Sequence, residues 1–388
     1  MTDVVVVGCA ETKIEIGSGR SAYDLAGEAM ASALADAGIE KAELDGFVVT
    51  NCMSEAGNPF WSNIAADYLG LELDFCQGID VGGASFVAGV ARAALAIRGG
   101  ACNTVLVLAA DAQSTGNHMR YGAYRTEWQD PVGLMGPPGA FGLITSRYMQ
   151  QFQLDFDALA KLAVVQRNHA LLNDLACERL RIPLTREDYL KSRIISDPIR
   201  LLDCVMVCDG ASAVVVTSAE RARSLSLRQQ CRILGYGEKV NYQITDPCPN
   251  ITQTGHSVAG RKALAQAKLS PTDIRMFHPY DDFLIAVLIQ FEQIGFCEPG
   301  EGSRFVLSHD LSYTGDLPLN TGGGQISAGQ AGLAGGAHNF VEATRQLFGA
   351  AGKRQVRNPT NAMVTGIGTI PYGRNWSTSA VMVLEAGN

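Results

Sequence analysis

The sequence predicts an α/β protein built from two similar halves, and two patterns lead to this prediction. Short, fully apolar runs bounded by turn residues recur along the 388 residues, with helical stretches between them. Such runs are typical of strands that are covered on both faces, and their alternation with helices is typical of α/β folds. A chain of this length suits two halves of roughly 150–200 residues each.

The expected elements follow from these runs. Strands that run parallel to one another are expected at residues 4–7, 105–109, 213–216 and 381–384, with a further strand at 232–235. The periodic stretches between them predict helices at residues 22–37, 84–97, 156–172, 260–267, 283–294 and 334–347.

The helix at 84–97 is apolar on every side, and residues 329–340 in the other half are similarly rich in glycine and alanine. A helix that is apolar all round has to be covered all round. We therefore expect each half to contribute one helix to a central layer between two sheets.

The two halves are expected to comprise residues 1–230 and 231–388. Within the first half, a stretch from about 116 to 202 carries several aromatic residues, arginines and a Gly-Pro-Pro-Gly turn. We expect this stretch to be an insertion that covers the pocket, because its pattern belongs to neither sheet.

Composition and charge exclude several classes of protein. The net charge is −8 and no cluster of lysines or arginines stands out, so no nucleic-acid partner is expected. No apolar run reaches the roughly 18 residues of a membrane helix and no signal peptide is evident, so we expect no membrane association and a cytoplasmic protein. The ten cysteines are scattered and the histidines lack ligand spacing, so no bound metal is expected.

Several motifs give the chain a family resemblance. Leu201-Leu202-Asp203-Cys204, followed by Asp209-Gly210-Ala211-Ser212-Ala213, resembles the signature of thiolases of the sterol-carrier-protein-x type. Asn320-Thr321-Gly322-Gly323-Gly324, followed by Gly329-Gln330-Ala331, resembles the thiolase glycine stretch and its Gly-His-Pro motif. The resemblance covers essentially the whole chain. It implies the thiolase fold, in which two similar α/β halves form a five-layer αβαβα arrangement.

The catalytic positions of the thiolase pattern are replaced. Where a thiolase carries its nucleophilic cysteine at the start of a helix, this chain reads Gly83-Ala84-Ser85. Tyr280 replaces the asparagine of the Asn-Glu-Ala-Phe loop, Gln330 replaces the histidine of Gly-His-Pro, and Tyr372 stands near the second cysteine. Covalent acyl transfer needs a thiolate, so it is not expected here. Ser85 has no histidine placed by motif to activate it, and we expect it to cap or pack the helix.

With these replacements the chain is similar to the cysteine-less, thiolase-like aldolases that shorten steroid side chains. The resemblance implies cleavage of a bulky β-hydroxyacyl-CoA to a short acyl-CoA and a ketone or aldehyde. Coenzyme A enters as part of the substrate, and no bound cofactor is implied. A retro-aldol step needs a base, a site for the enolate oxygen and an acid, but it needs no nucleophile.

Candidates for proton transfer follow from the replaced positions. Tyr280 is the first candidate and Tyr372 the second. A free tyrosine is a poor base at neutral pH, so a neighbour such as His278 or Asp281 is expected to tune Tyr280. Gln330, which replaces the histidine of Gly-His-Pro, is the remaining catalytic candidate.

Binding roles are expected at backbone and cationic positions. The turn at Gly83 and Ala84 opens a helix whose free N–H groups suit a developing oxyanion, and Gly323 is assigned to the same enolate site. The candidates for contacts with the CoA phosphates are arginines of the inserted stretch, Arg120, Arg125 and Arg147.

Two other interpretations of the sequence stay open. One is a thiolase or acyltransferase that acts on a 3-oxoacyl-CoA with a relocated nucleophile, and the other is a non-catalytic subunit that binds acyl-CoA or lipid. The resemblance further implies a homodimeric core, for which the strand at 105–109 is the candidate contact. It also implies a DUF35-type partner with an OB-fold and a zinc ribbon, giving a heterotetramer.

Overall fold

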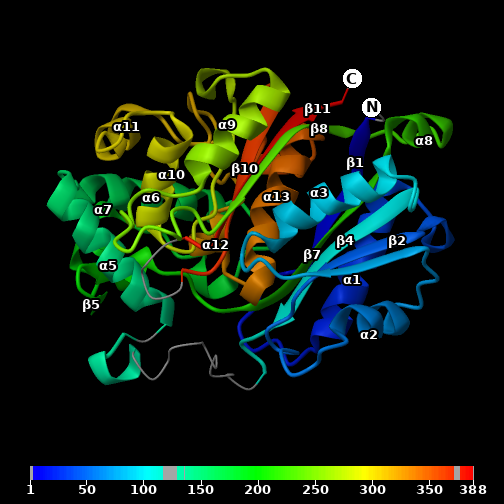
Figure 1. Cartoon of the computed structure of the whole chain (residues 1–388), viewed down its shortest axis with the longest axis horizontal. Helices are drawn as coiled ribbons and strands as arrows, with labels where there is room; N and C mark the ends of the chain where they lie inside the picture. The colour runs from blue at the N-terminus through cyan, green and yellow to red at the C-terminus, as the bar shows by residue number, and fades with distance from the viewer. Residues whose placement is uncertain (1–2, 117–128, 135, 371–375, 388) are drawn as a thin grey trace.

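The computed structural model describes residues 3–116, 129–134, 136–370 and 376–387. Nine strands within these residues form one sheet in the order β3-β2-β4-β7-β1-β8-β11-β10-β9 (Figure 1). Their bounds are β1 Val4–Glu11, β2 Gly46–Thr50, β3 Phe75–Ile79, β4 Thr104–Ala112, β7 Asp209–Ser218, β8 Cys231–Val240, β9 Phe277–His278, β10 Asn361–Ile367 and β11 Thr378–Ala386.

The strand directions are mixed, so the expectation of parallel strands is wrong. β2 pairs in parallel with β3 and β4, and β9 with β10, whereas β7 runs antiparallel to both β1 and β4. β11 is likewise antiparallel to β8 and β10. Helix layers bury these strands on both faces, and this burial gives them an apolar pattern whichever way they run.

The helices and the two parts of the sheet form five layers, as expected. α1 (Ala22–Ala37) packs on β1, β4 and β7, and α9 (His256–Ala267) packs on β8 and β11. Between these layers lie α3 (Ser85–Arg98) and α13 (Gly335–Leu347), each in contact with strands from both parts of the sheet (Figure 1). The two parts meet only through Val5 and Val6 of β1, paired with β8, and this short junction lets the sheet fold around the central helices.

The helix boundaries are close to those expected because their signals are local. α1 begins after Ser21, which forms a capping box with Asp24, and it ends at Gly38 in the left-handed conformation. α6 (Phe156–Leu171) and α10 (Leu284–Ile294) also lie within one residue of expectation. α9 begins earlier than expected, at His256, whose backbone N–H donates to the Thr254 hydroxyl.

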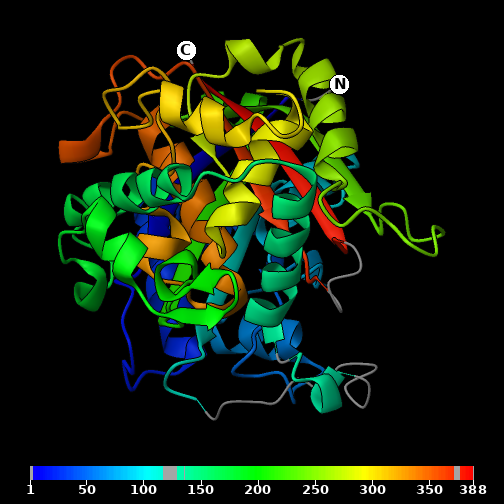
Figure 2. The same ribbon diagram turned by 90° about the vertical axis from the view of Figure 1, so that its left-hand side faces the viewer.

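The stretch that precedes β7 lies outside the large sheet. It contains α5 (Gly136–Gln151), α6, α7 (Arg186–Lys191) and a small hairpin of β5 (Ile194–Ser196) and β6 (Ile199–Arg200). α6 packs on α10, α11 (Gly302–Ser308) and α12 (Gly324–Ala328) (Figure 2). A segment from the first half of the sequence therefore covers helices of the second half. No described helix combines the length and apolarity needed to span a bilayer.

The strand at 105–109, the candidate contact between two copies of the chain, lies inside the sheet. It belongs to β4, which is paired with β7 along its whole length and with β2 over residues 105–108. The outer strand of this part of the sheet is β3. An inner strand has no free hydrogen-bonding groups to offer to a second copy.

Buried ion pairs fasten α13 to β1. Both Glu11 carboxylate oxygens are engaged, one by His338 Nδ1 and the other by Arg345 Nη1, each at 2.7 Å. Glu342, which also belongs to α13, accepts a hydrogen bond from Arg354 Nη2 at 2.7 Å. Burial opposes ionisation of Glu11, but His338 and Arg345 outweigh it and hold the pKa of Glu11 well below its usual range.

Glu11→Gln should destabilise the protein by about 3–5 kcal/mol at pH 7, because it leaves the buried cations without their anion. Urea denaturation measures this loss. The lowered folded-state pKa means that the stabilisation is complete above the unfolded pKa of about 4.3 and is lost as the pH falls below it. Glu28→Gln, in the exposed pair with Arg20, is the control and should cost no more than about 1 kcal/mol. Equal losses in the two variants would contradict the assignment.

Candidate active site

The hydroxyl of Tyr280 occupies the space that a side chain at position 83 would need. Gly83 lies in the turn before α3, and a Cβ atom built on it would stand 2.1 Å from Tyr280 Oη and 2.3 Å from Tyr280 Cζ. Real Cβ atoms essentially never approach other atoms so closely. The glycine at 83 and the tyrosine at 280 are therefore physically linked, since the ring fits only because residue 83 has no side chain.

Backbone from two other segments closes around the same ring. A Cβ on Gly336, in the first turn of α13, would stand 2.5 Å from the Gly83 carbonyl oxygen and 3.0 Å from Tyr280 Cε2. A Cβ on Gly82 would stand 2.8 Å from the backbone nitrogen of Thr369, and Gly82 has a φ of +63°, which favours glycine. The site thus lies where the starts of both central helices meet the end of β10.

The main chain of Tyr280 is fixed on both sides. Its N–H donates to Thr365 Oγ1 on β10 at 2.8 Å, and its carbonyl oxygen accepts from Gln290 Nε2 on α10 at 2.8 Å. Thr365 Oγ1 in turn donates to Gln290 Oε1, so the two side chains that hold the Tyr280 main chain also bond to each other. Tyr280 is only 4% exposed. These bonds hold the hydroxyl in a defined position against the start of α3.

Gln330 reaches the Tyr280 hydroxyl, a contact that the sequence did not predict. Its Nε2 donates to Tyr280 Oη at 3.4 Å and to Gln325 Oε1 at 3.1 Å. Its backbone is held by a β-bridge to Val207. The bond to Tyr280 Oη places an amide donor beside the phenol oxygen.

Asp281 acts as an anchor for neighbouring helices. Its carboxylate accepts from the backbone N–H groups of Gln325 and Ile326 at the start of α12, at 3.0 and 3.2 Å, and from Asn339 Nδ2 of α13 at 3.0 Å. Burial raises its pKa, against the opposing effect of these donors. The geometry therefore supports a positioning role for Asp281 beside Tyr280.

His278 lies at the end of β9 and is fully buried. Neither ring nitrogen has a hydrogen-bond partner among the described residues, and burial lowers its pKa to about 4. The imidazole is therefore neutral at physiological pH. The charge of Glu342 opposes the effect of burial on this pKa.

Asp282 was not singled out by the sequence, although it adjoins the candidate residues. Its side chain is partly exposed, and its Oδ1 is buried with no partner in the described part of the chain. Burial and the charge of Asp281 raise the pKa of Asp282 to about 8. The raised pKa makes Asp282 a candidate proton donor.

Ser85 is used within the turn, as expected. Its hydroxyl donates to the Gly82 carbonyl oxygen at 2.6 Å and accepts from the Val81 N–H at 2.9 Å. Gly323, assigned to the enolate site, faces the Ala170 side of the molecule, and its N–H donates to the Asn320 carbonyl oxygen at 2.8 Å. Gly83 and Ala84 are the members of that set that lie beside Tyr280.

The remaining candidates are not tested by the geometry. Tyr372, Arg120 and Arg125 lie outside the described residues, and Arg147 is an exposed residue of α5. Their roles stay predictions. Three residues that hold the site were missed, namely Gln290, Thr365 and Asn339. Their only sequence signal is that each is a polar residue within a largely buried element.

Comparison with known families agrees with this geometry. Residues 4–220 match the family model described as the thiolase N-terminal domain, and residues 237–386 match the thiolase C-terminal domain-like family. Together the two matches include both central helices and every segment that contacts Tyr280.

Two relatives and one solved structure are similar over nearly the whole chain. A steroid side-chain-cleaving aldolase of Thermomonospora curvata is 32% identical, with 94% of this chain and 95% of the relative covered. A 17-hydroxy-3-oxo-4-pregnene-20-carboxyl-CoA lyase of Mycobacterium tuberculosis is 34% identical, with 89% and 92% covered. The solved structure of an Ltp2-ChsH2(DUF35) aldolase is 30% identical, covers 99% of this chain and 98% of its own, and has a TM-score of 0.87. The chain is therefore a member of the thiolase superfamily.

Proposed function

We propose that this protein is a CoA-ester aldolase that cleaves a bulky β-hydroxyacyl-CoA by a retro-aldol step. The observation that carries the proposal is the Tyr280 hydroxyl, which lies where the side chain of a thiolase nucleophile would stand. A site arranged in this way can move a proton but cannot form a thioester with residue 83. The names of the two relatives support a lyase of this kind.

In the proposed step, the β-hydroxyl group gives its proton to Tyr280 and its oxygen becomes a carbonyl. The bond between the α- and β-carbons breaks, and its electron pair forms an enolate on the thioester. The N–H groups at Gly83 and Ala84, at the start of α3, are the proposed site for the enolate oxygen. Transfer of the β-hydroxyl proton requires the phenolate of Tyr280, and the Gln330 amide is placed to hydrogen-bond its oxygen.

The enolate α-carbon must then take a proton to give the short acyl-CoA. Tyr372 and Asp282 are the candidate donors. The raised pKa of Asp282, about 8, suits a group that is protonated before the reaction at neutral pH. Coenzyme A would be part of the substrate, and no bound cofactor is needed for this chemistry.

The bulky part of the substrate is proposed to be a steroid or bile-acid type of skeleton. Both named relatives act on steroids according to their names, and both match about nine-tenths or more of their own length.

We also propose a cytoplasmic location. The candidates for contacts with the CoA phosphates remain the exposed Arg147 together with Arg120 and Arg125, which lie outside the described residues.

Assembly is proposed to involve a homodimer and a DUF35-type partner, giving a heterotetramer. The similar solved structure is named for an aldolase with a DUF35 component. For the homodimer we propose the outer strand β3 together with α2 (Trp61–Tyr68), which contacts it. Phe60, Ile64 and Tyr68 repeat at four-residue spacing and are 65%, 42% and 54% exposed. An apolar stripe beside a free strand edge is typical of a contact between subunits.

Tyr280→Phe should lower the cleavage rate by about 10²–10⁴-fold, the range for a positioned proton-transfer group. Substrate affinity should change no more than about tenfold, as for one lost hydrogen bond. The ring still fills its place, so the thermal melt should be near that of the parent. Single-turnover kinetics and calorimetric binding measure the two effects. Tyr148→Phe, which removes a buried hydroxyl bonded to Glu292, is the matched control and should keep its rate. If Tyr280→Phe cleaves at a rate close to that of the parent, proton transfer must be assigned to Tyr372 or His278 instead.

The thiolase alternative has one specific candidate, Cys177. Its hydrogen bond with Cys208 lowers the pKa of Cys177, against the effect of burial. The two cysteines pack around Gly329, on the far side of the segment that carries Gln330, and Cys177 is only 3% exposed. A thiolate there is shielded from an acyl-CoA.

Cys177→Ala should therefore retain most of the cleavage activity. Incubation of the parent with a 3-oxoacyl-CoA should give no acyl adduct in intact-mass spectrometry, because residue 83 has no side chain and Tyr280 fills the space in front of it. A cysteine-bearing thiolase run in parallel provides the positive control. An acyl adduct that disappears in Cys177→Ala would establish the relocated nucleophile. Binding of acyl-CoA without turnover, even with a DUF35 partner, would instead favour the non-catalytic subunit.

A further inference from the structure

A cavity of about 200 Å³ lies beneath the helices that cover the second half of the chain. Its walls come from α6, from residues 180–184, from residues 201–206 and from α12. Nine of its eleven lining residues have apolar or thiol side chains, and the two polar ones are Arg167 and Ser327. A mostly apolar cavity with few convergent polar groups is the usual form of a small-molecule site.

Arg167 is a buried cation without an anion. It is 7% exposed, and its Nε donates to Ser327 Oγ at 3.3 Å while its Nη1 donates to the Ile182 carbonyl oxygen at 3.1 Å. No ion pair within the described ranges includes Arg167. Burial lowers its pKa, and no neighbouring charge offsets this effect.

Two other arginines, the half-buried Arg345 and the buried Arg354, show how this fold otherwise pairs such a group. Arg345 lies 2.7 Å from a Glu11 oxygen, and Arg354 lies 2.7 Å from a Glu342 oxygen. A buried guanidinium without a carboxylate is energetically costly, whereas a carboxylate that binds it makes strong, charge-assisted hydrogen bonds. The unpaired Arg167 is therefore the feature of the cavity that needs an explanation.

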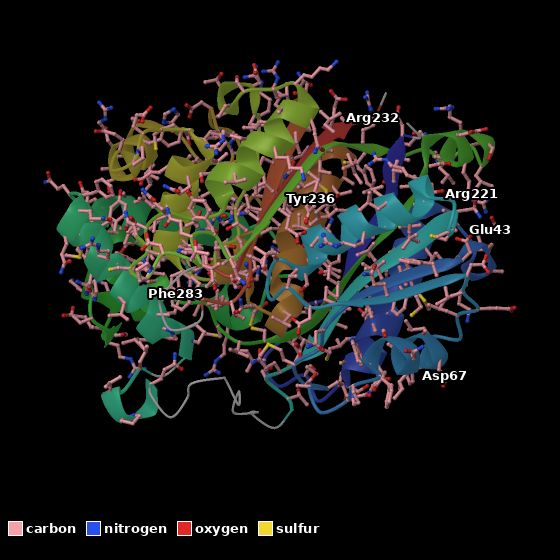
Figure 3. The ribbon with its side chains drawn as sticks, in the orientation of Figure 1. Glu43, Asp67, Arg221, Arg232, Tyr236 and Phe283 are labelled. Carbon is pink, nitrogen blue, oxygen red and sulfur yellow. The ribbon has the colours of Figure 1, made fainter. Side chains whose placement is uncertain are left out.

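The cavity shares a wall with the candidate active site. Ile326 and Ser327 belong to α12, whose first N–H groups bind Asp281. On the other side, the Val205 N–H donates to the Asp282 carbonyl oxygen at 3.3 Å. Phe283 follows directly and stacks on Phe141 of α5, with ring centroids 4.0 Å apart, where the covering helices meet the second half (Figure 3).

We propose that this cavity binds an apolar molecule or group that carries one carboxylate, with Arg167 as the residue that pairs with the carboxylate. Two sources have this chemistry. One is the far end of the acyl-CoA, and this source rests on the proposed aldolase function. The other is a separate ligand, such as a free medium-chain fatty acid.

The direct test is calorimetric titration with decanoate, with decanol as the uncharged control. Decanoate should bind the parent about 10–100-fold more tightly than decanol, as expected for hydrogen bonds to a charged group. Arg167→Met keeps an apolar side chain but removes the charge, and it should lower decanoate affinity to the level of decanol. Arg186→Met, on the nearby exposed surface of α7, should leave binding unchanged.

Thermal melting separates this role from a purely structural one. Without ligand, Arg167→Met should melt at or above the temperature of the parent, because an unpaired buried charge has been removed. A lower melting temperature together with unchanged decanoate affinity would assign Arg167 to structure and overturn the proposal. Equal binding of decanoate and decanol to the parent, or binding of neither, would also overturn it.

Cleavage assays then distinguish the two sources. If the substrate fills the cavity, decanoate should compete with acyl-CoA, and Arg167→Met should raise KM only for acyl-CoA substrates with a distal carboxylate. If a separate ligand fills it, decanoate should bind without competing. Either result supports the site. The calorimetric test requires no turnover, so absence of aldol cleavage would remove the proposed function without removing the carboxylate site.

Discussion

The ring of Tyr280 and a side chain at position 83 compete for one space in front of α3. A Cβ atom at residue 83 would lie 2.1 Å from the phenol oxygen, and one at Gly336 would lie 3.0 Å from the ring. Glycine at both positions lets the hydroxyl stand at the start of a helix, where N–H groups favour negative charge. Glycine at position 83 removes the nucleophilic side chain and also leaves room for the Tyr280 hydroxyl. The two changes in the pocket therefore occur together.

The position of that ring depends on α13, the helix that carries Gly336 and Asn339. This helix is fastened to β1 by the Glu11 carboxylate, which binds both His338 and Arg345. Buried charges are therefore paired where the fold needs a rigid central layer. Arg167 differs, because its guanidinium borders a cavity and lacks an anion among the described residues. This contrast separates a charge that supports the fold from one that is available to a ligand.

Local signals explain what could be predicted from sequence. The cap at Ser21 and the glycine at 38 place α1 to the residue, and the all-apolar pattern at 84–97 places α3 in the central layer. Strand direction depends on the route of the chain between distant strands, and the apolar pattern does not encode it. Tyr280 and Gly83 were each identified through motifs, but their contact joins residues far apart in sequence. The anchoring by Gln290 and Asn339, and the isolation of Arg167, depend likewise on tertiary packing.

A double-mutant cycle of Gly83→Ala and Tyr280→Phe tests the central steric claim most directly. Gly83→Ala should slow cleavage because its Cβ displaces the ring, and a melt near the parent's would show that the fold survives. Residues in contact give non-additive effects. We therefore expect Gly83→Ala to lower the rate no further in a Tyr280→Phe background. Losses that multiply in the double variant would show that residue 83 and Tyr280 act independently, and would contradict the account.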